Sequence, residues 1–382
     1  MTVLVTNADD WIALAVCRSL GKRGIDAAMA SHRKDAMSFS SKYCKERHIY
    51  RDPSCDPEGF MDDLAEIAES GSYEYVVPTN DITLMAISSM RDRLEKYVTV
   101  PLPSHETIEL CDDKSKTLRL AEKEGIPCPR TAYIKDEADL KEVKKTFSFP
   151  VVIKPFRGQG ARGVKFVTSP EDLQKEYETT HAQHGEAMVQ EYVRGTRYLL
   201  AALYNKNFEA RTMSLHRVIR FVGGATIYGE TDYHPEAVEY GLRLLKRAGV
   251  YGMGQVDFIV DEKDGTPKLM EINPRFFGSV QIHIAAGVDY PYLFHRLVTE
   301  GDVEKRFEYR RGVRSRYILK DMSHLAAALS GRSPYNYTTG KTKTLMEFFR
   351  SFSCRDDYVF SGEDIGPGVS EIRNLVLRKA RR

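Results

Sequence analysis

Acidic and amide side chains lie within two apolar segments in a pattern that suits a divalent cation. Residues 255–260 and 268–273 are typical of strands, and the turn-forming segment 261–267 between them predicts a hairpin. With a period of two, Glu271 and Asn273 point to one face, and Asp257 lies near them across the pair. Two carboxylates and an amide oxygen inside apolar strands favour magnesium, with phosphate oxygens completing its shell. The alternative is a solvent-facing edge with scattered acids.

A glycine-rich loop joins two further strand-like segments, 151–155 and 164–167. Its glycines are Gly158, Gly160 and Gly163. Glycines allow backbone N–H groups to turn toward one point, which is the geometry that holds phosphate oxygens. Lys154 ends an otherwise apolar strand, where a buried ammonium group needs an anion. The pattern predicts a triphosphate loop, and a flexible hairpin tip is the alternative.

Two more segments could contact a nucleotide. Residues 188–193 and 194–198 are typical of a strand, a tight turn and a strand, which could present backbone groups to an adenine edge or form an ordinary core hairpin. Residues 110–129 are typical of one helix with its end signals, with Asp112 or Asp113 as the N-cap, Gly125 as the stop and Pro127 beyond it. Lys114 lies in its first turn, where the helix dipole disfavours a cation, so either an external anion or a nearby carboxylate is expected. A solvated surface lysine is the simpler interpretation.

The first hundred residues contain the elements that must support these groups. Short apolar strands at 3–5, 26–30 and 75–77 alternate with helical segments, which predicts a parallel α/β layer. A further short strand is expected at 98–100. The segment after the first strand lacks the GxGxxG fingerprint, which argues against a dinucleotide site.

Composition and charge limit the class of protein. The 382 residues are 42% hydrophobic and 29% charged with a net charge of +2, as in a folded protein of two to three domains that is not built for nucleic acid. Residues 301–382 carry 17 Lys/Arg against 10 Asp/Glu, an excess of seven basic residues. The six cysteines form no CxxC pair, so reduced thiols and a cytoplasmic location are expected. We expect no signal peptide and no membrane-spanning segment.

The order of these motifs resembles the ATP-grasp superfamily, from the N-terminus to about residue 301. Residues 271–275 (EINPR) resemble the metal and reaction motif of carbamoyl phosphate synthetase, biotin carboxylase and related carboxylate-amine ligases. A closer likeness is to stand-alone ATP-dependent carboligases, through residues 271–279 and 285–291. The resemblance implies an α/β ATP-grasp fold with an α+β lid. Its implied parts are a parallel pre-ATP-grasp domain at 1–105, an ATP-grasp domain at 106–300 with its lid at about 140–192, and a basic C-terminal extension at 301–382.

The resemblance also implies roles for individual residues. ATP and Mg²⁺, with Mn²⁺ as an alternative metal, are the implied cofactors. The implied nucleotide-binding residues are Lys114, Lys154, Gly158, Gly160, Gly163, Gln190, Glu191 and Val193. Asp257, Glu271 and Asn273 are the implied metal ligands, and Lys154 and Arg275 the implied catalytic residues. Gln190 replaces the usual adenine-hinge glutamate, but its amide oxygen can still accept a hydrogen bond. Arg197 replaces a ribose-binding glutamate, which leaves Glu191 as the candidate for that contact.

The implied reaction joins a carboxylate to an amine or thiol through an acyl phosphate. The second hypothesis is a carbamoyl-phosphate-forming or biotin-dependent carboxylating enzyme. It ranks below the ligase because the sequence shows no duplicated half, glutaminase region or biotin carrier. A non-catalytic ATP-binding module is third. The expected partners are small-molecule carboxylates and amines, and a homodimer is left open.

Two basic clusters have open interpretations. Arg211, His216, Arg217 and Arg220 could line a pocket for an anionic acceptor or form a solvated hairpin. Lys305, Arg306, Arg310, Arg311, Arg314 and Arg316 could bind an acidic partner or a membrane surface, although a charged exposed face is more common.

Overall fold

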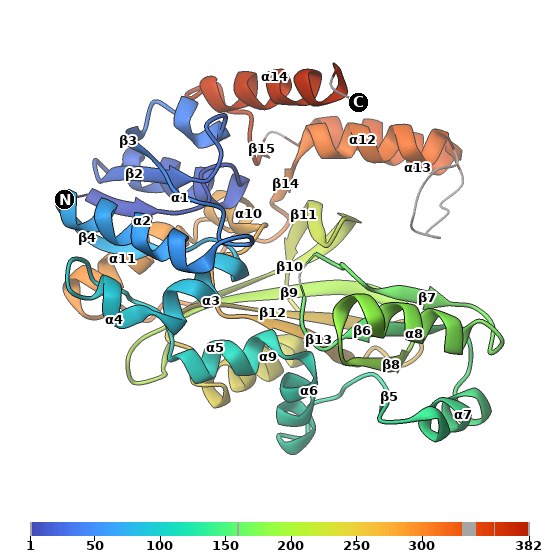
Figure 1. Cartoon of the computed structure of the whole chain (residues 1–382). Helices are drawn as coiled ribbons and strands as arrows, with labels where there is room; N and C mark the ends of the chain where they lie inside the picture. The colour runs from blue at the N-terminus through green and yellow to red at the C-terminus, as the bar shows by residue number, and fades with distance from the viewer. Residues whose placement is uncertain (1, 159, 331–340, 355, 381–382) are drawn as a thin grey trace. The chain divides into compact units, whose positions relative to one another are not determined.

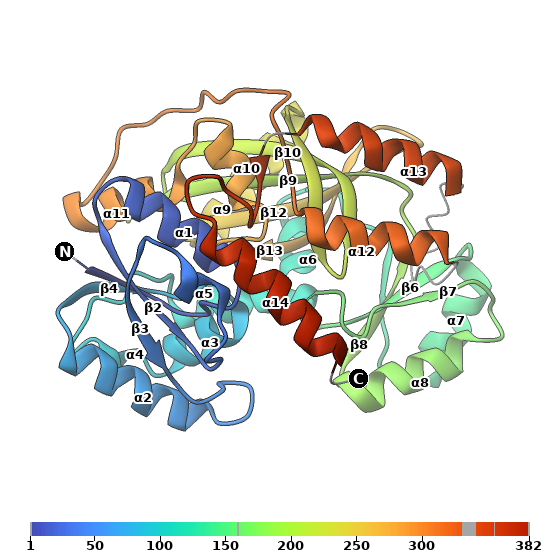
Figure 2. The same ribbon diagram turned by 90° about the horizontal axis from the view of Figure 1, so that it is seen from above.

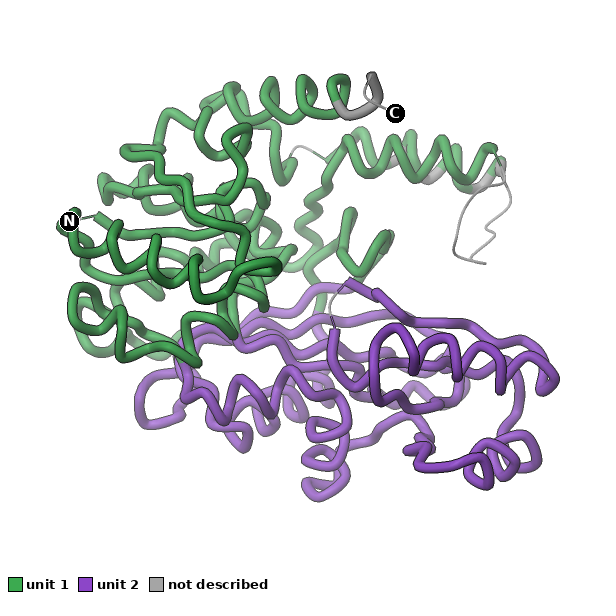
Figure 3. The backbone as a smooth tube through the Cα atoms, in the orientation of Figure 1, with its two compact units in different colours: residues 1–102, 218–232, 275–382 green, residues 103–217, 233–274 purple. Residues whose placement is uncertain are grey.

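The computed structural model describes residues 2–158, 160–330, 341–354 and 356–380. The chain divides into two compact units, shown in Figure 3. Unit 1 comprises residues 1–102, 218–232 and 275–382, and unit 2 comprises residues 103–217 and 233–274. Within the described residues, none of the helices is long and apolar enough to cross a membrane.

Unit 1 contains the parallel sheet expected near the N-terminus. Its strand order is β3-β2-β1-β4, and every pair is parallel. The strands are β1 (Thr2–Val5), β2 (Asp26–Ser31), β3 (Cys44–Ile49) and β4 (Tyr73–Val77), and the helices are α1 (Trp11–Lys22), α2 (Pro57–Ser70), α3 (Asp81–Ser89) and α4 (Arg91–Leu94). Leu4, Phe60 and Val76 belong to its buried core. The strand expected at 98–100 is reduced to a single parallel bridge between Tyr75 and Thr99.

The rest of unit 1 is formed by residues 218–232 and the segment 275–382. Its elements are β11 (Ala225–Asp232), α10 (Val280–Ala285), α11 (Tyr290–Glu300), β14 (Arg314–Arg316), α12 (Ile318–Leu329), α13 (Lys341–Arg350), β15 (Asp356–Asp357) and α14 (Gly366–Ala380). Leu14, Tyr317 and Tyr358 share one buried cluster, which joins α1 to this segment. In Figure 2, α14 begins beside the N-terminal sheet, where it contacts the short 3-10 helix Met37–Ser40. Residues 301–382, which the sequence presents as an extension, are therefore grouped with residues 1–102.

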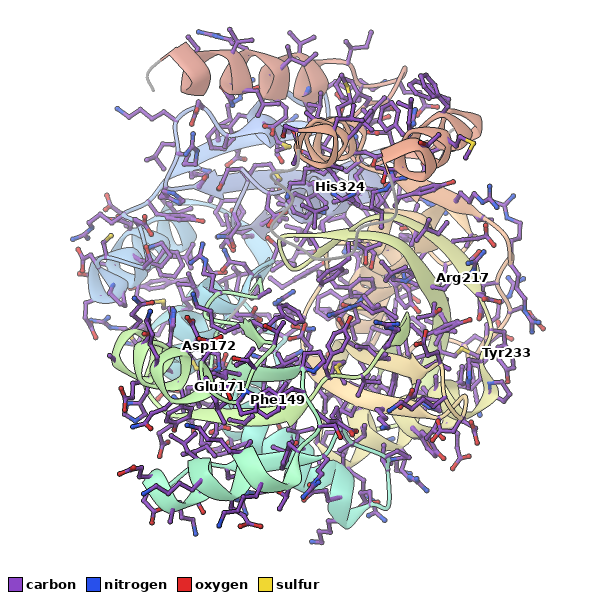
Figure 4. The ribbon with its side chains drawn as sticks, turned by 90° about the vertical axis from the view of Figure 1, so that its right-hand side faces the viewer. Phe149, Glu171, Asp172, Arg217, Tyr233 and His324 are labelled. Atoms are coloured by element: carbon purple, nitrogen blue, oxygen red, sulfur yellow. The ribbon has the colours of Figure 1, made fainter. Side chains whose placement is uncertain are left out.

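Unit 2 contains two sheets. The first is antiparallel with the order β5-β8-β6-β7 and carries two helices. Its elements are β5 (Thr131–Tyr133), α7 (Glu137–Thr146), β6 (Val151–Pro155), β7 (Lys165–Val167), α8 (Leu173–His184) and β8 (Ala187–Glu191). Phe149 packs against its buried cluster, and Glu171 and Asp172 precede α8 in Figure 4. The expected β6–β7 hairpin around the glycine loop is confirmed, with Ile153 paired to Lys165.

The second sheet of unit 2 holds the acidic hairpin. Its strands are adjacent in the order β13 (Pro267–Asn273), β12 (Gly252–Asp261), β9 (Gly195–Tyr204) and β10 (Ala210–Val222). The remaining helices of the unit are α5 (His105–Asp112), α6 (Lys114–Lys123) and α9 (Pro235–Arg247), drawn in Figure 1. The helix predicted within residues 110–129 is α6 together with the end of α5, and Asp113 between them is the N-cap of α6.

The two strands predicted within residues 188–198 are present as β8 and β9. The alternative, a hairpin, is wrong, because β8 pairs with β5 and β6 whereas β9 pairs with β10 and β12. Residues 192–194 instead connect one sheet of unit 2 to the other.

Candidate active site

The acidic side chains of the β12–β13 hairpin lie opposite each other. Asp257 is the cross-strand partner of Glu271, and Gln255 is the partner of Asn273. The Asn273 amide nitrogen donates to the Glu271 carboxylate at 3.5 Å. Asp257 is buried, so the two carboxylates repel each other in a setting with little water. A divalent cation would relieve this repulsion, and the donor set of two carboxylates and one amide oxygen fits magnesium.

Phosphate oxygens would be needed to complete such a site. Across the part of the chain that the structure describes, no cluster of three or more His, Cys, Asp or Glu side chains could hold a metal ion by itself.

A β-bulge in β13 decides which side chains share a face with Glu271. Asp257 pairs with Glu271 but Phe258 pairs with Leu269, so Met270 is the extra residue of β13. Without the bulge, residues three apart on one strand would point to opposite faces. Because Ile259 pairs with Lys268, the bulge brings Lys268 to the same face as Glu271.

Lys154, on β6, is a cation without a carboxylate partner. Its ammonium group contacts the Met270 sulfur at 3.7 Å, and it forms no ion pair with a described residue. Burial and the neighbouring Arg197 charge lower the pKa of Lys154 to about 7, whereas the Glu271 carboxylate acts in the opposite direction. A partly buried lysine in contact with a thioether needs an anion, and a phosphate group meets that need.

The glycine loop is joined to the start of α6. The Lys114 backbone N–H donates to the Phe156 carbonyl at 2.8 Å, and the Lys114 ammonium group donates to the Gly158 carbonyl at 2.8 Å. Gly158, Gly160 and Gly163 have φ values of 130°, 62° and 73°, which L side chains rarely adopt. These three positions therefore require glycine, and Lys114 lies at the base of the loop, whose binding of phosphate stays a prediction.

The end of β8 and the connection that follows it carry the predicted adenine-hinge residues. Gln190 is buried and its amide nitrogen donates to the Thr131 hydroxyl at 2.8 Å. Glu191 accepts a hydrogen bond from the Lys268 ammonium group at 2.8 Å, and Lys268 also pairs with Asp261 at 3.0 Å. Glu191, the carboxylate proposed for ribose recognition, is thus already ion-paired with Lys268, a residue that the sequence analysis did not identify.

An apolar surface adjoins the hinge. Val193, Ile259 and Met270 form one small buried cluster, with Met270 in contact with Lys154. A flat apolar surface beside backbone hydrogen-bonding groups is what an adenine ring requires. Only Val193 of these three was predicted from the sequence. The alternating pattern of β12 could have identified Ile259, but the bulge at Met270 leaves no sequence signal.

Arg275 belongs to unit 1 and is already paired. Its guanidinium contacts the Asp81 carboxylate through two nitrogens, and a third nitrogen donates to the Phe276 carbonyl at 2.9 Å. Asp81 is the first residue of α3. Sequence reasoning did not identify this partner, which lies 194 positions away in the chain.

Several side chains of the two basic clusters are buried or make contacts within the protein. Arg220 forms a buried ion pair with Asp321, and burial lowers the pKa of His216 to about 3, so that this imidazole is neutral. Arg314 pairs with Glu230, and Arg316 donates to the Ser351 hydroxyl and lies over the Phe352 ring. These four side chains support the structural interpretation of the two clusters.

Comparisons with known proteins find similarity to one domain family and to several enzymes. The ATP-grasp domain family matches residues 111–279. The 2-oxoglutarate carboxylase small subunit of Hydrogenobacter thermophilus is 23% identical over 84% of this chain and 68% of its own length. A D-alanine–D-alanine ligase of Pelotomaculum thermopropionicum is 26% identical over 62% of this chain and 79% of its own.

Solved structures share the fold. The N5-carboxyaminoimidazole synthetase of Staphylococcus aureus in complex with ADP has a TM-score of 0.68 at 15% identity, covering 92% of this chain and 96% of that one. The biotin carboxylase domain dimer of the Hydrogenobacter thermophilus 2-oxoglutarate carboxylase, with MgADP and bicarbonate, also has a TM-score of 0.68, at 20% identity, covering 82% and 73%. The α/β fold and the family resemblance predicted from the sequence are confirmed, with residues 111–279 matching the ATP-grasp domain family.

Proposed function

We propose that this chain is an ATP- and magnesium-dependent ligase that joins a carboxylate to an amine or thiol through an acyl phosphate. The reaction would release ADP and phosphate. The family match and the ligases among the relatives support this class of enzyme.

One observation carries the proposal. Within unit 2, a lysine without a carboxylate partner and two carboxylates opposed across a hairpin flank the bulge residue Met270. The lysine forms no ion pair with a described residue, so it needs an anion, and a divalent cation would relieve the repulsion between the two carboxylates. A magnesium nucleotide supplies both, because its phosphates can contact Lys154 while its metal lies against Asp257 and Glu271.

The side chains have the following proposed tasks. Lys114, Lys154 and the backbone of the glycine loop bind the phosphates, and Gln190 and Val193 orient the base. Asp257, Glu271 and Asn273 would hold magnesium, which neutralises phosphate charge when bound. Arg275 binds the phosphorylated carboxylate through a charge-assisted contact.

The chemistry needs no side-chain nucleophile. An oxygen of the substrate carboxylate attacks the γ-phosphorus, and the bond to the β–γ bridging oxygen breaks, so ADP leaves. The amine nitrogen then attacks the acyl carbon, which forms the amide and releases phosphate and a proton. Positioning and charge neutralisation account for most of such catalysis.

A second candidate phosphorylates bicarbonate in place of an organic acid. The likeness to the 2-oxoglutarate carboxylase small subunit favours it. The two candidates differ in the acid that accepts the phosphoryl group, so the same residues in unit 2 would serve both.

The test is a coupled ADP-release assay of the full chain with MgATP against a matrix of carboxylic acids and amines, with and without bicarbonate. Hydroxylamine is added in a parallel series to intercept the acyl phosphate as a hydroxamate. ADP release that depends on one acid, together with hydroxamate, supports the ligase. Release that needs bicarbonate alone supports the carboxylating alternative. Nucleotide binding without ADP release in any combination would indicate a non-catalytic module and refute the proposal.

We infer small-molecule partners, a cytoplasmic location and a homodimer as further parts of the proposal. All six cysteines are free, which agrees with a reducing compartment. The related biotin carboxylase domain is described as a dimer. Light scattering of the purified full chain tests the dimer.

A further inference from the structure

Helix α14 presents an apolar face to the outside of unit 1. Four side chains recur at the spacing of one helix face, and Ile365, Val369, Ile372 and Val376 are 65%, 58%, 45% and 61% exposed. Leu377 beside them is 44% exposed. Figures 1 and 3 show α14 along one edge of unit 1. An apolar stripe with this spacing ordinarily faces a protein core, so its exposure indicates a surface that binds another molecule.

The contacts of α14 with the rest of unit 1 come from its polar side. The Asn374 amide nitrogen donates to the Asp35 carbonyl at 2.8 Å, and the Glu371 carboxylate accepts from the Tyr317 hydroxyl at 3.0 Å. The helix is therefore held in place by polar side chains while its apolar stripe is exposed, which is the reverse of the usual arrangement of a surface helix.

Other exposed apolar side chains lie in the same part of the chain. Among the described residues, 15 large hydrophobic side chains are exposed, and ten of them belong to residues 322–377. Met346, Phe349 and Phe352, in and just after α13, form a second exposed group. Single exposed apolar residues are ordinary, but such a concentration in one segment marks an interaction surface.

Basic residues accompany the apolar stripe of α14. Residues 365–382 contain five Lys/Arg and one acidic residue, which gives a net charge of +4. The acidic residue is Glu371, which contacts Tyr317 of the protein itself, whereas Arg373 is exposed next to Ile372. Exposed apolar side chains flanked by basic ones match the chemistry of an anionic membrane surface. There the apolar groups enter the acyl boundary, and the basic groups contact the head groups.

The same charge argues against a second copy of this chain as the occupant. In a twofold-symmetric dimer the same surface patch meets itself, so two segments of net charge +4 would face each other and repel. A homodimer of this chain would thus use another face.

We propose that α14 binds the surface of an anionic phospholipid bilayer, with Ile365, Val369, Ile372 and Val376 at the boundary between head groups and acyl chains. The helix lies in the plane of the membrane and does not cross it. The proposal goes beyond the ligase activity and depends on neither ATP nor turnover. It agrees with the proposed cytoplasmic location, because the cytoplasmic leaflet carries anionic lipid.

The test is flotation of the full chain with lipid vesicles in the absence of nucleotide. One set of vesicles is phosphatidylcholine alone, and the other contains phosphatidylglycerol as well. We expect binding at least about tenfold tighter to the anionic vesicles, because each basic residue near the surface adds to the affinity. Raising the sodium chloride concentration should weaken this binding, because salt screens the attraction.

Four variants make the test specific to α14. Ile372→Gln and Val376→Gln should each weaken vesicle binding about tenfold, since each removes one apolar side chain that enters the bilayer. Arg373→Gln should weaken it about fivefold. The matched control is Ile49→Gln in β3, because Ile49 is also 45% exposed and belongs to the same unit, and it should bind like the unaltered chain. Glutamine is a good helix former, and circular dichroism confirms that each variant is folded.

Each outcome decides the matter. Binding that requires anionic lipid and is weakened by Ile372→Gln and Val376→Gln, but not by Ile49→Gln, supports the proposal. Equal binding to both kinds of vesicle would overturn the anionic surface as the occupant. Binding that these α14 variants leave unchanged would overturn the role of α14, and no binding to either kind of vesicle would overturn the membrane contact.

Light scattering of the same variants tests the alternative occupant. A change from dimer to monomer in Ile372→Gln, without vesicle binding by the unaltered chain, would assign the face to a second copy and overturn the proposal. ADP release plays no part in any of these measurements, so failure of the proposed ligase activity would be seen separately.

Discussion

At the scale of single residues, the opposed pair Asp257 and Glu271 carries the clearest functional requirement. Replacing Glu271 with glutamine keeps its shape and removes the charge that would hold magnesium. We expect Glu271→Gln to lower ADP formation by more than about 100-fold in a folded protein. Glu262→Gln is the matched control, because Glu262 lies in the same hairpin and makes only an exposed ion pair with Arg194 at 3.5 Å. Near-normal ADP formation by Glu271→Gln would remove Glu271 from the metal site.

The lowered pKa of Lys154 predicts that nucleotide binding depends on pH. Burial lowers the pKa of Lys154 to about 7, so its ammonium group is charged below that pH and becomes neutral above it. The affinity for a non-hydrolysable ATP analogue with magnesium should therefore fall between about pH 6 and about pH 8. Lys154→Arg keeps its charge over this range and should show no such fall.

Calorimetric titration of both proteins measures the effect, and the arginine variant corrects for titration of the nucleotide itself. If the two proteins have the same pH profile, Lys154 does not contact the phosphates.

Arg275 can be tested by a change that keeps its charge. Lysine cannot reproduce the two-nitrogen contact that Arg275 makes with Asp81, nor a similar contact with an acyl phosphate. We expect Arg275→Lys to reduce ligation much more than nucleotide affinity, while Asp81→Asn, which leaves the guanidinium in place, reduces ligation less. Equal losses of ligation and nucleotide affinity in Arg275→Lys would argue against a role on the acyl phosphate. Single-turnover ligation and calorimetry provide the two readouts.

At the scale of elements, local signals predicted most of the strands and helices near the site. The turn-rich segment 261–267 correctly predicted the β12–β13 hairpin, and Asp113 correctly predicted the start of α6. Strand β3 was missed because its sequence, CKERHI, is mostly polar and its side chains are largely exposed or half-buried. A strand that pairs through its backbone on a half-exposed edge leaves little hydrophobic pattern to detect.

Features set by long-range pairing could not be predicted. The separation of β8 and β9 into different sheets depends on partners far away in the chain, such as Thr131 for Gln190 and Asp261 for Gly195. The bulge at Met270 is likewise a property of the pairing with β12. As a result, Lys268 and Glu191 meet although 77 positions separate them.

The glycine loop gives a prediction about the first sheet of unit 2. A methyl group at Gly163 would lie 2.6 Å from the His184 ring and 2.7 Å from Pro155, at a φ of 73°. Gly185 has a φ of 77° but open space around it. Gly163→Ala should therefore lower the unfolding free energy more than Gly185→Ala does. In Gly185→Ala only the unfavourable positive φ of the alanine lowers it, by about 1–2 kcal/mol. Urea denaturation compares the two variants, and equal losses would mean that the loop relaxes around the added methyl group.

At the scale of the whole molecule, the C-terminal segment contributes to the core of unit 1. The Arg18 guanidinium pairs with Asp364 at 2.8 Å and donates to the Val359 carbonyl at 2.8 Å. Asp364 also accepts from the Ser41 hydroxyl at 2.8 Å and from the Lys42 N–H at 2.9 Å. A segment that appears in the sequence as a basic extension thus completes buried contacts around α1.

Asp364 therefore provides a test of this role. Burial alone would raise the pKa of Asp364, but the hydrogen bonds from Arg18, Lys42 and Ser41 outweigh it and the pKa is lowered. A lowered pKa means that the stabilisation is present above the ordinary aspartate pKa and is lost as the pH falls through the folded-state value.

We expect Asp364→Ala to lower the unfolding free energy by about 3 kcal/mol at neutral pH, because it leaves the Arg18 charge buried and unpaired. Glu363→Ala, which removes only the exposed pair with Lys22 at 2.8 Å, should leave it unchanged. Urea denaturation measures both, and hydrogen exchange should show faster exchange in α1 for Asp364→Ala alone. Equal stability of the two variants would mean that the C-terminal segment does not support the N-terminal sheet through this contact.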